Sequence, residues 1–119
     1  MYLNEYQEKA MSTCMESCKN IAYMITGLTA EVGEVNDKIA KAVRKEQVKI
    51  TRNNLCVWEN RTPPNFKEEL AKELGDCLWF IAGLSDVLGF DLEDVAQMNI
   101  NKLASRKERG VIDGNGDNR

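Results

Sequence analysis

Apolar residues recur at three- and four-residue steps along four stretches of the chain, which is the spacing of an amphipathic helix. The clearest stretch spans 20–45, with the apolar positions Ile21, Met24, Ile25, Leu28, Val32, Val35, Ile39 and Val43. The stretch 65–88 has a second stripe, formed by Leu70, Leu74, Cys77, Leu78, Ile81, Leu84 and Leu88. Shorter patterns cover 3–18 (Tyr6, Ala10, Met11) and 91–107 (Leu92, Val95, Ala96, Ile100, Leu103). The pattern predicts an all-α fold with a four-helix bundle-like core.

Capping and breaking residues set the expected helix ends. Asn4 and Asn65 are candidate N-caps of the first and third helices, and Asp91 is a candidate N-cap of the fourth. Gly89 should end the third helix. Because so short a connection joins the last two helices, we expect them to be antiparallel neighbours.

Two segments lack a helical pattern. An insert at about 46–64 contains Asn53-Asn54 and Thr62-Pro63-Pro64, which are turn and breaker signals, and is compatible with a short hairpin. A tail at about 110–119 is rich in Gly, Asn and Asp and should be a flexible arm. With 119 residues, the chain 1–119 fits a single domain.

Composition excludes several function classes. The net charge of −3 argues against nucleic acid as a partner, although an acidic site attracts phosphate once it holds a divalent cation. No apolar run is long enough to span a membrane, and the first residues do not resemble a signal peptide, so no membrane partner is expected and the expected location is the cytoplasm.

The chain contains four cysteines and no histidine. Without imidazole there is no Ser-His-Asp or Cys-His pair, and the Glu-x-x-His motifs of di-iron carboxylate bundles are missing. The cysteines lack zinc-site spacing and are expected to be reduced, structural thiols. Any catalysis must therefore depend on carboxylates, amines or a metal.

Two pairs of acids have the required chemistry. Glu31 and Glu34 are three residues apart in one predicted helix, and Glu73 and Asp76 have the same spacing in another. Residues at this spacing share a face of a helix, and both acidic strips border apolar stripes that should pack. Converged carboxylates repel unless a cation joins them, and magnesium prefers oxygen ligands. The alternative is that all four acids are solvated surface residues.

Asn99, Lys102 and Arg106 share a face of the last predicted helix, and Asn99 lies near the middle of its apolar stripe. Lys102 and Arg106 would suit phosphate oxygens, and Lys38 near the first acidic strip has the same chemistry. The alternative is that these cations pair with neighbouring acids or complement a helix C-terminus.

Taken together, these motifs resemble a known family. Gly27-Leu28-Thr29-Ala30-Glu31-Val32-Gly33-Glu34-Val35 with Lys38, Glu73-Leu74-Gly75-Asp76, and Asn99 with Lys102 and Arg106 are similar to the MazG-type all-α nucleoside triphosphate pyrophosphohydrolases. The ends of the chain also resemble small stand-alone or phage-borne members.

The resemblance implies Mg²⁺-dependent cleavage of (deoxy)nucleoside triphosphates between the α and β phosphates, with Mn²⁺ as a substitute. It implies Glu31, Glu34, Glu73 and Asp76 as metal ligands. Positions expected near the triphosphate are Lys38, Asn99, Lys102 and Arg106. We expect Glu34, Glu31 and Lys38 to be catalytic, with Glu34 taking a proton from the attacking water. Family members also resemble one another in forming homodimers or homotetramers with the site near an interface.

One departure concerns the 38 residues, Val35 to Lys72, between the two acidic motifs, which exceed the usual compact pattern. Trp58 and Arg61 in the insert are candidates for a lid, a base-contacting loop or extra dimer surface. Trp79 is the other candidate for stacking on a base, but packing is the favoured reading for it. Alternative functions are a pyrophosphatase selective for one nucleotide (dUTP, dCTP or a phosphoribosyl nucleotide) and a non-enzymatic helical adaptor.

Overall fold

The structure is a computed structural model of the chain, and it describes residues 1–55, 58 and 60–119. The elements are α1 (Leu3–Met11), the short 3-10 helix η1 (Glu16–Cys18), α2 (Ile21–Arg44), α3 (Phe66–Val87) and α4 (Leu92–Glu108). The described residues contain no strand, so the all-α prediction is confirmed there. Within the same residues, no helix is both long and apolar enough to cross a membrane.

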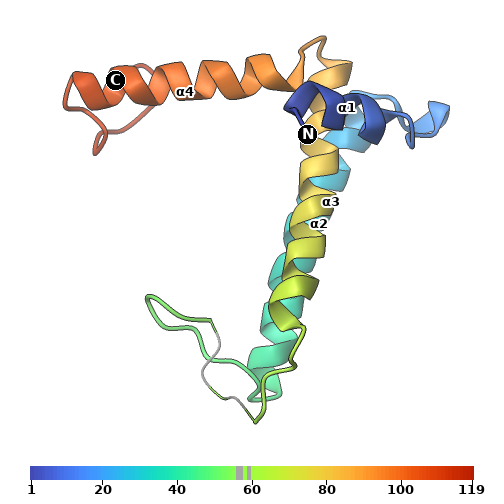
Figure 1. Cartoon of the computed structure of the whole chain (residues 1–119), viewed down its shortest axis with the longest axis vertical. Coiled ribbons are helices and arrows are strands. Elements are labelled where there is room, and N and C mark those ends of the chain that lie inside the picture. The colour runs from blue at the N-terminus through green and yellow to red at the C-terminus, as the bar shows by residue number, and fades with distance from the viewer. Residues whose placement is uncertain (56–57, 59) are drawn as a thin grey trace.

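The long helices α2 and α3 pack side by side, and α1 lies across one end of this pair (Figure 1). Two glycines allow the close contact between α2 and α3. A Cβ atom on Gly27 would lie 2.0 Å from Cε1 of Phe80, and one on Gly83 would lie 2.4 Å from Sδ of Met24. The helix pair is therefore a closely packed and rigid scaffold.

A small apolar core closes the opposite end of the pair. It consists of Ala42, Val48, Phe66 and Leu70, with Val35, Ile39 and Leu55 packed around them. The Thr62 hydroxyl donates a hydrogen bond to the Gln47 carbonyl and so joins the two ends of the insert. A hairpin would require two strands, and the described part of the insert contains none. Cys56, Val57 and Glu59, which also belong to the insert, lie outside the described residues.

The expected caps are largely replaced by contacts between distant segments. Asn4 lies inside α1, and its side-chain oxygen accepts a hydrogen bond from the Glu93 backbone N–H at 3.0 Å. Gln7, also in α1, accepts from the Leu92 N–H at 2.9 Å. Asp91 is the N-cap residue of α4, but its side chain makes no cap hydrogen bond. The beginning of α4 is thus capped by α1.

Asn65 also occupies an N-cap position without a side-chain cap bond, whereas Asn20 caps α2 by accepting from the Tyr23 N–H at 2.8 Å. The first helix ends at Met11 instead of continuing to Cys18. The hydroxyls of Ser12 and Thr13 bond to backbone carbonyls of the last turn, which competes with further helix.

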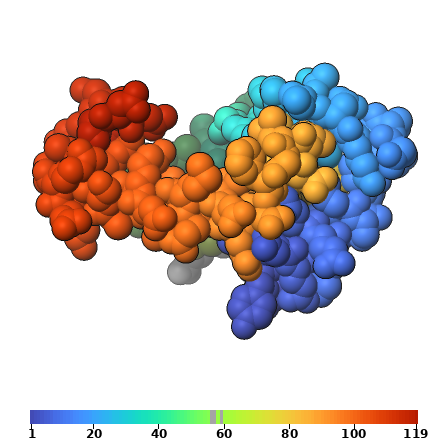
Figure 2. All heavy atoms as spheres, turned by 90° about the horizontal axis from the view of Figure 1, so that it is seen from above, coloured from blue at the N-terminus to red at the C-terminus, as the bar shows by residue number. Residues whose placement is uncertain are grey.

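The prediction that the last two helices are antiparallel neighbours is wrong. Gly89 does end α3, with φ of +82°, but α4 then runs away from the α2–α3 pair (Figure 1). Figure 2 shows α4 and the tail standing out from the rest of the molecule. The physical reason is that α1 holds only the beginning of α4. Apolar side chains farther along α4, including Met98 and Ile100, are about 60% exposed.

The tail is also different from the flexible arm that we predicted. Residues 110–119 fold back on the end of α4, where Arg106 and Arg119 donate hydrogen bonds to tail carbonyls. Arginine has five donors in a planar fork, so one side chain can hold several carbonyls in a loop without regular secondary structure.

Candidate metal and phosphate site

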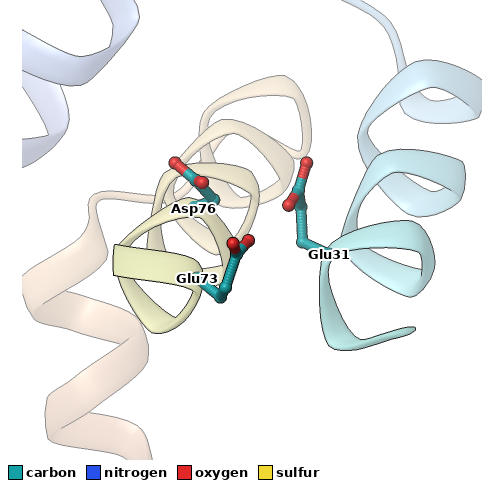
Figure 3. Close-up of side chains that lie close together, drawn as sticks. All are labelled: Glu31, Glu73 and Asp76. Carbon is teal, nitrogen blue, oxygen red and sulfur yellow. The ribbon is translucent and has the colours of Figure 1, made fainter. Parts of the chain in front are cut away.

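Three of the four predicted acidic ligands converge. Glu31 reaches from α2 toward Glu73 and Asp76 on α3 (Figure 3), and one carboxylate oxygen of each lies within 4.8 Å of the others. Glu31 and Glu73 are partly buried, and Asp76 is exposed. The close packing of α2 against α3 therefore brings these three carboxylates together with one side open to solvent.

The cluster carries a net negative charge, because three carboxylates have one neighbouring cation, Lys38, among the described residues. Burial raises the pKa of the Glu31 carboxyl, and the neighbouring Asp76, Glu73 and Glu34 raise it further, in that order. Asp76 also adds to the raised pKa of the Tyr6 hydroxyl, for which burial is the larger cause. Three carboxylate oxygens, one from each residue, are held together here by two packed helices. That donor set fits a hard divalent cation such as Mg²⁺.

Lys38 lies at the edge of the cluster. Its ammonium is 3.1 Å from Oε1 of Glu73 and 3.8 Å from Oε2 of Glu69. The hydrogen bond to Glu73 is the main cause of the raised pKa of Lys38, and Glu69 and Glu34 add to it. Lys38 thus lies beside the carboxylates, as the sequence predicted, and it forms ion pairs with Glu73 and Glu69.

Glu34 lies outside the group of three. It is exposed on α2, yet close enough to raise the pKa of both Glu31 and Lys38. The glycines inside the two acidic motifs, Gly33 and Gly75, face open space, and a Cβ atom on either would meet nothing within 4 Å. No described atom therefore covers the surface at these two glycines beside the carboxylates.

A single chain does not bring the predicted residues of α4 to the carboxylates, because α4 runs away from the α2–α3 pair (Figure 1). Asn99 and Lys102 instead line a cavity of about 330 Å³ together with Phe90, Val95 and Met98. Arg106 is buried beneath the tail, with only 5% of its surface exposed.

The two tryptophans differ in role. Trp79 donates hydrogen bonds from Nε1 to the Ala10 carbonyl at 3.1 Å and to the Thr13 hydroxyl at 3.0 Å, and its ring packs edge-on against Phe80. Trp79 is therefore a packing residue that joins α1 to α3, as favoured from the sequence. Trp58 in the insert stacks under the Arg61 guanidinium, 5.2 Å from the ring centroid.

Three polar residues make contacts that the sequence did not predict, and only Asn4 among them had an expected role, as the N-cap of the first helix. Gln7 is 6% exposed and bonds to the connection between α3 and α4, Asn4 caps α4, and Asp117 pairs with Lys102 and Arg106. All three contacts join segments distant in sequence or lie in the loop-like tail. No periodic pattern marks them.

These helices and carboxylates belong to a recognisable protein class. Residues 19–111 match the family model described as the MazG nucleotide pyrophosphohydrolase domain, so the chain belongs to the MazG family and has a nucleotide pyrophosphohydrolase domain. It is similar to the Gene 37 protein of Mycobacterium phage L5, with 36% identity over 126 residues and the full length of both chains covered. No solved structure matches.

Proposed function

We propose that this protein hydrolyses (deoxy)nucleoside triphosphates between the α and β phosphates in a Mg²⁺-dependent reaction, releasing a monophosphate and pyrophosphate. The convergence of Glu31, Glu73 and Asp76 is the observation that carries the proposal. Solvated acids of an adaptor protein would have no reason to meet across two helices, since their mutual repulsion costs stability.

Glu31, Glu73 and Asp76 would hold the ion, with Glu34 one turn away as a fourth oxygen donor. When bound, Mg²⁺, or Mn²⁺ in its place, neutralises charge on the phosphate oxygens. Glu34 is exposed and available as a general base. In the reaction, the water oxygen forms a bond to one of the two phosphorus atoms, α or β, and Glu34 accepts the proton of the water. The bond from that phosphorus to the α–β bridging oxygen breaks, and the bridging oxygen leaves with the other phosphate. The Lys38 ammonium donates to phosphate oxygens when substrate replaces its carboxylate partners.

We also propose that the active assembly is a homodimer or homotetramer in which Asn99 and Lys102 of the partner subunit face the carboxylates. The exposed apolar side chains of α4 support this, as do Val32 and Leu74, which are 49% and 58% exposed beside the acidic residues. Gly33 and Gly75 have no side chain and no atom close to their Cβ positions, so another helix could approach the backbone beside the acidic residues. The base would contact the insert, with Trp58 as the stacking residue.

Pyrophosphate release should be assayed across canonical and modified triphosphates at fixed Mg²⁺. Turnover of at least one triphosphate that stops on chelation is expected, and activity confined to dUTP or dCTP would identify the selective alternative. No pyrophosphate from any member of the panel would refute the proposed reaction.

The subunit arrangement is tested by complementation. The variants Glu73→Gln and Lys102→Met should each be nearly inactive alone, and mixing them after dissociation should restore about a quarter of wild-type activity for a dimer with independent sites. Mixtures no more active than the separate variants would show that each site is built from one chain.

A further inference from the structure

The tail is a built structure on the end of α4, anchored by a buried cation. The Arg106 side chain is 6% exposed, and its Nη2 donates to the Gly116 carbonyl at 3.2 Å and the Asp117 carbonyl at 3.1 Å. The same nitrogen lies 3.2 Å from the Asp117 carboxylate. These contacts of Nη2 join Arg106 to residues 116–117 of the tail, whereas the buried Nε of the same guanidinium has no hydrogen-bond partner among the described residues.

A second arginine, Arg119, forms hydrogen bonds to backbone carbonyls within the tail itself. Arg119 donates from Nε to the Val111 carbonyl at 2.9 Å, from Nη2 to the Ile112 carbonyl at 3.2 Å, and from Nη1 to the Gly116 carbonyl. Arg109 in turn donates to the Arg119 carbonyl at 2.8 Å. The beginning and the end of the tail are therefore tied to each other and to α4.

This anchored tail presents one carboxylate to Lys102. Oδ1 of Asp117 lies 3.3 Å from the Lys102 ammonium, and it is the same oxygen that contacts Arg106. The Lys102 side chain remains 41% exposed, and it borders the cavity that Asn99 also lines. Arg106 is covered by the tail, so Lys102 is the more accessible of the two cations on this face.

We propose that Asp117 is a positioning residue, which fixes the Lys102 ammonium so that its remaining donors point at a substrate phosphate. A free lysine side chain loses considerable rotamer freedom when it binds a ligand, and a carboxylate that already holds it reduces this loss. The Asp117 side chain is 83% exposed, so solvent screens its repulsion of phosphate. In this proposal the ordering of Lys102 outweighs the screened repulsion. The inference rests on the proposed function, because it takes Lys102 as a phosphate contact.

The test compares Asp117→Ala with Asp113→Ala, which removes the same charge from the same tail at an exposed residue without an ion pair in the described part of the chain. The readouts are the dissociation constant of a non-hydrolysable α,β-methylene triphosphate with Mg²⁺, and kcat and KM for the best substrate. Asp117→Ala should weaken binding and raise KM about twofold to fivefold, as for an exposed ion pair, with kcat nearly unchanged. Asp113→Ala should behave like the wild type.

A double-mutant cycle separates positioning from a general effect on the tail. Once Lys102→Met has removed the ammonium, adding Asp117→Ala should weaken analogue binding no further. Wild-type or tighter binding by Asp117→Ala would overturn the proposal, as would effects of the two substitutions that multiply. A wild-type protein that binds the analogue without releasing pyrophosphate from any triphosphate would refute the proposed reaction, and the dissociation constants would still decide the role of Asp117. A wild-type protein that does not bind the analogue would overturn the role of Asp117.

Discussion

Replacing Glu73 by Gln removes one of the three converging carboxylates and keeps the size and shape of the side chain. In the absence of metal two effects oppose each other. The repulsion that Glu31 and Asp76 experience is relieved, whereas the Lys38 ammonium loses its partner at 3.1 Å. We therefore expect the helical content and the metal-free melting temperature of Glu73→Gln to remain close to those of the wild type.

The response to Mg²⁺ should differ sharply. A ligand at ten times its dissociation constant stabilises the folded state by about 1.4 kcal/mol. For a chain of 119 residues, this corresponds to a rise in melting temperature of roughly 6 °C. If loss of the Glu73 carboxylate weakens binding about 100-fold, the same Mg²⁺ concentration contributes less than about 0.1 kcal/mol, and the midpoint shifts by less than about 0.5 °C.

Glu69→Gln is the matched control. Glu69 is on the same helix and also faces Lys38, at 3.8 Å, but it is not one of the three clustered acids. Thermal melting should be measured by circular dichroism at one protein concentration, with and without Mg²⁺. Glu69→Gln should retain the full Mg²⁺ shift and most of the turnover. A Glu73→Gln variant with a wild-type Mg²⁺ shift, or equal losses in both variants, would refute the assignment of this metal site.

Three further predictions concern the scaffold and the titration of the site. Gln7→Ala removes the acceptor of the Leu92 N–H and the donor to the Ala82 and Phe90 carbonyls, the first of these two bonds buried and the second partly buried. Urea unfolding should therefore show a loss of about 2–3 kcal/mol, whereas Glu8→Ala at the exposed neighbouring position should change the stability little, and equal stabilities of the two variants would contradict the role of Gln7. Gly75→Ala meets no atom within 4 Å and should raise the unfolding free energy by about 0.5–1 kcal/mol while reducing turnover, and unchanged turnover would argue against close approach of a ligand or helix there. Because folded Glu31 keeps its proton above the ordinary pKa of 4.5, that proton stabilises the metal-free fold below this pKa, and the contribution is lost as pH rises through the raised value. Mg²⁺ must displace the same proton, so calorimetry should show affinity increasing with pH in that window, and a flat profile would exclude Glu31 as a ligand.

The sequence by itself determined the helices and the acidic residues of the site. Periodicity located all four helices because apolar side chains recur at helical spacing in each, although the second half of the stripe of α4 is exposed in the single chain. The spacing of Glu31, Glu73 and Asp76 relative to the stripes of α2 and α3 predicted their convergence. The same reasoning favoured packing for Trp79, which the hydrogen bonds to Ala10 and Thr13 confirm.

Only the tertiary structure decided the direction of α4 and the form of the tail. The beginning of α4 is capped by Asn4 and Gln7, which lie more than 80 residues earlier, and the tail is held by Arg106 and Arg119 through backbone carbonyls. Such contacts depend on which side chains lie close together in the folded chain. Neither hydrophobic spacing nor local turn residues predict that proximity. The local sequence pattern therefore predicted that the carboxylates lie on two packed helices. Long-range hydrogen bonds at the beginning of α4 set its direction, and in the single chain Lys102 lies away from the carboxylates.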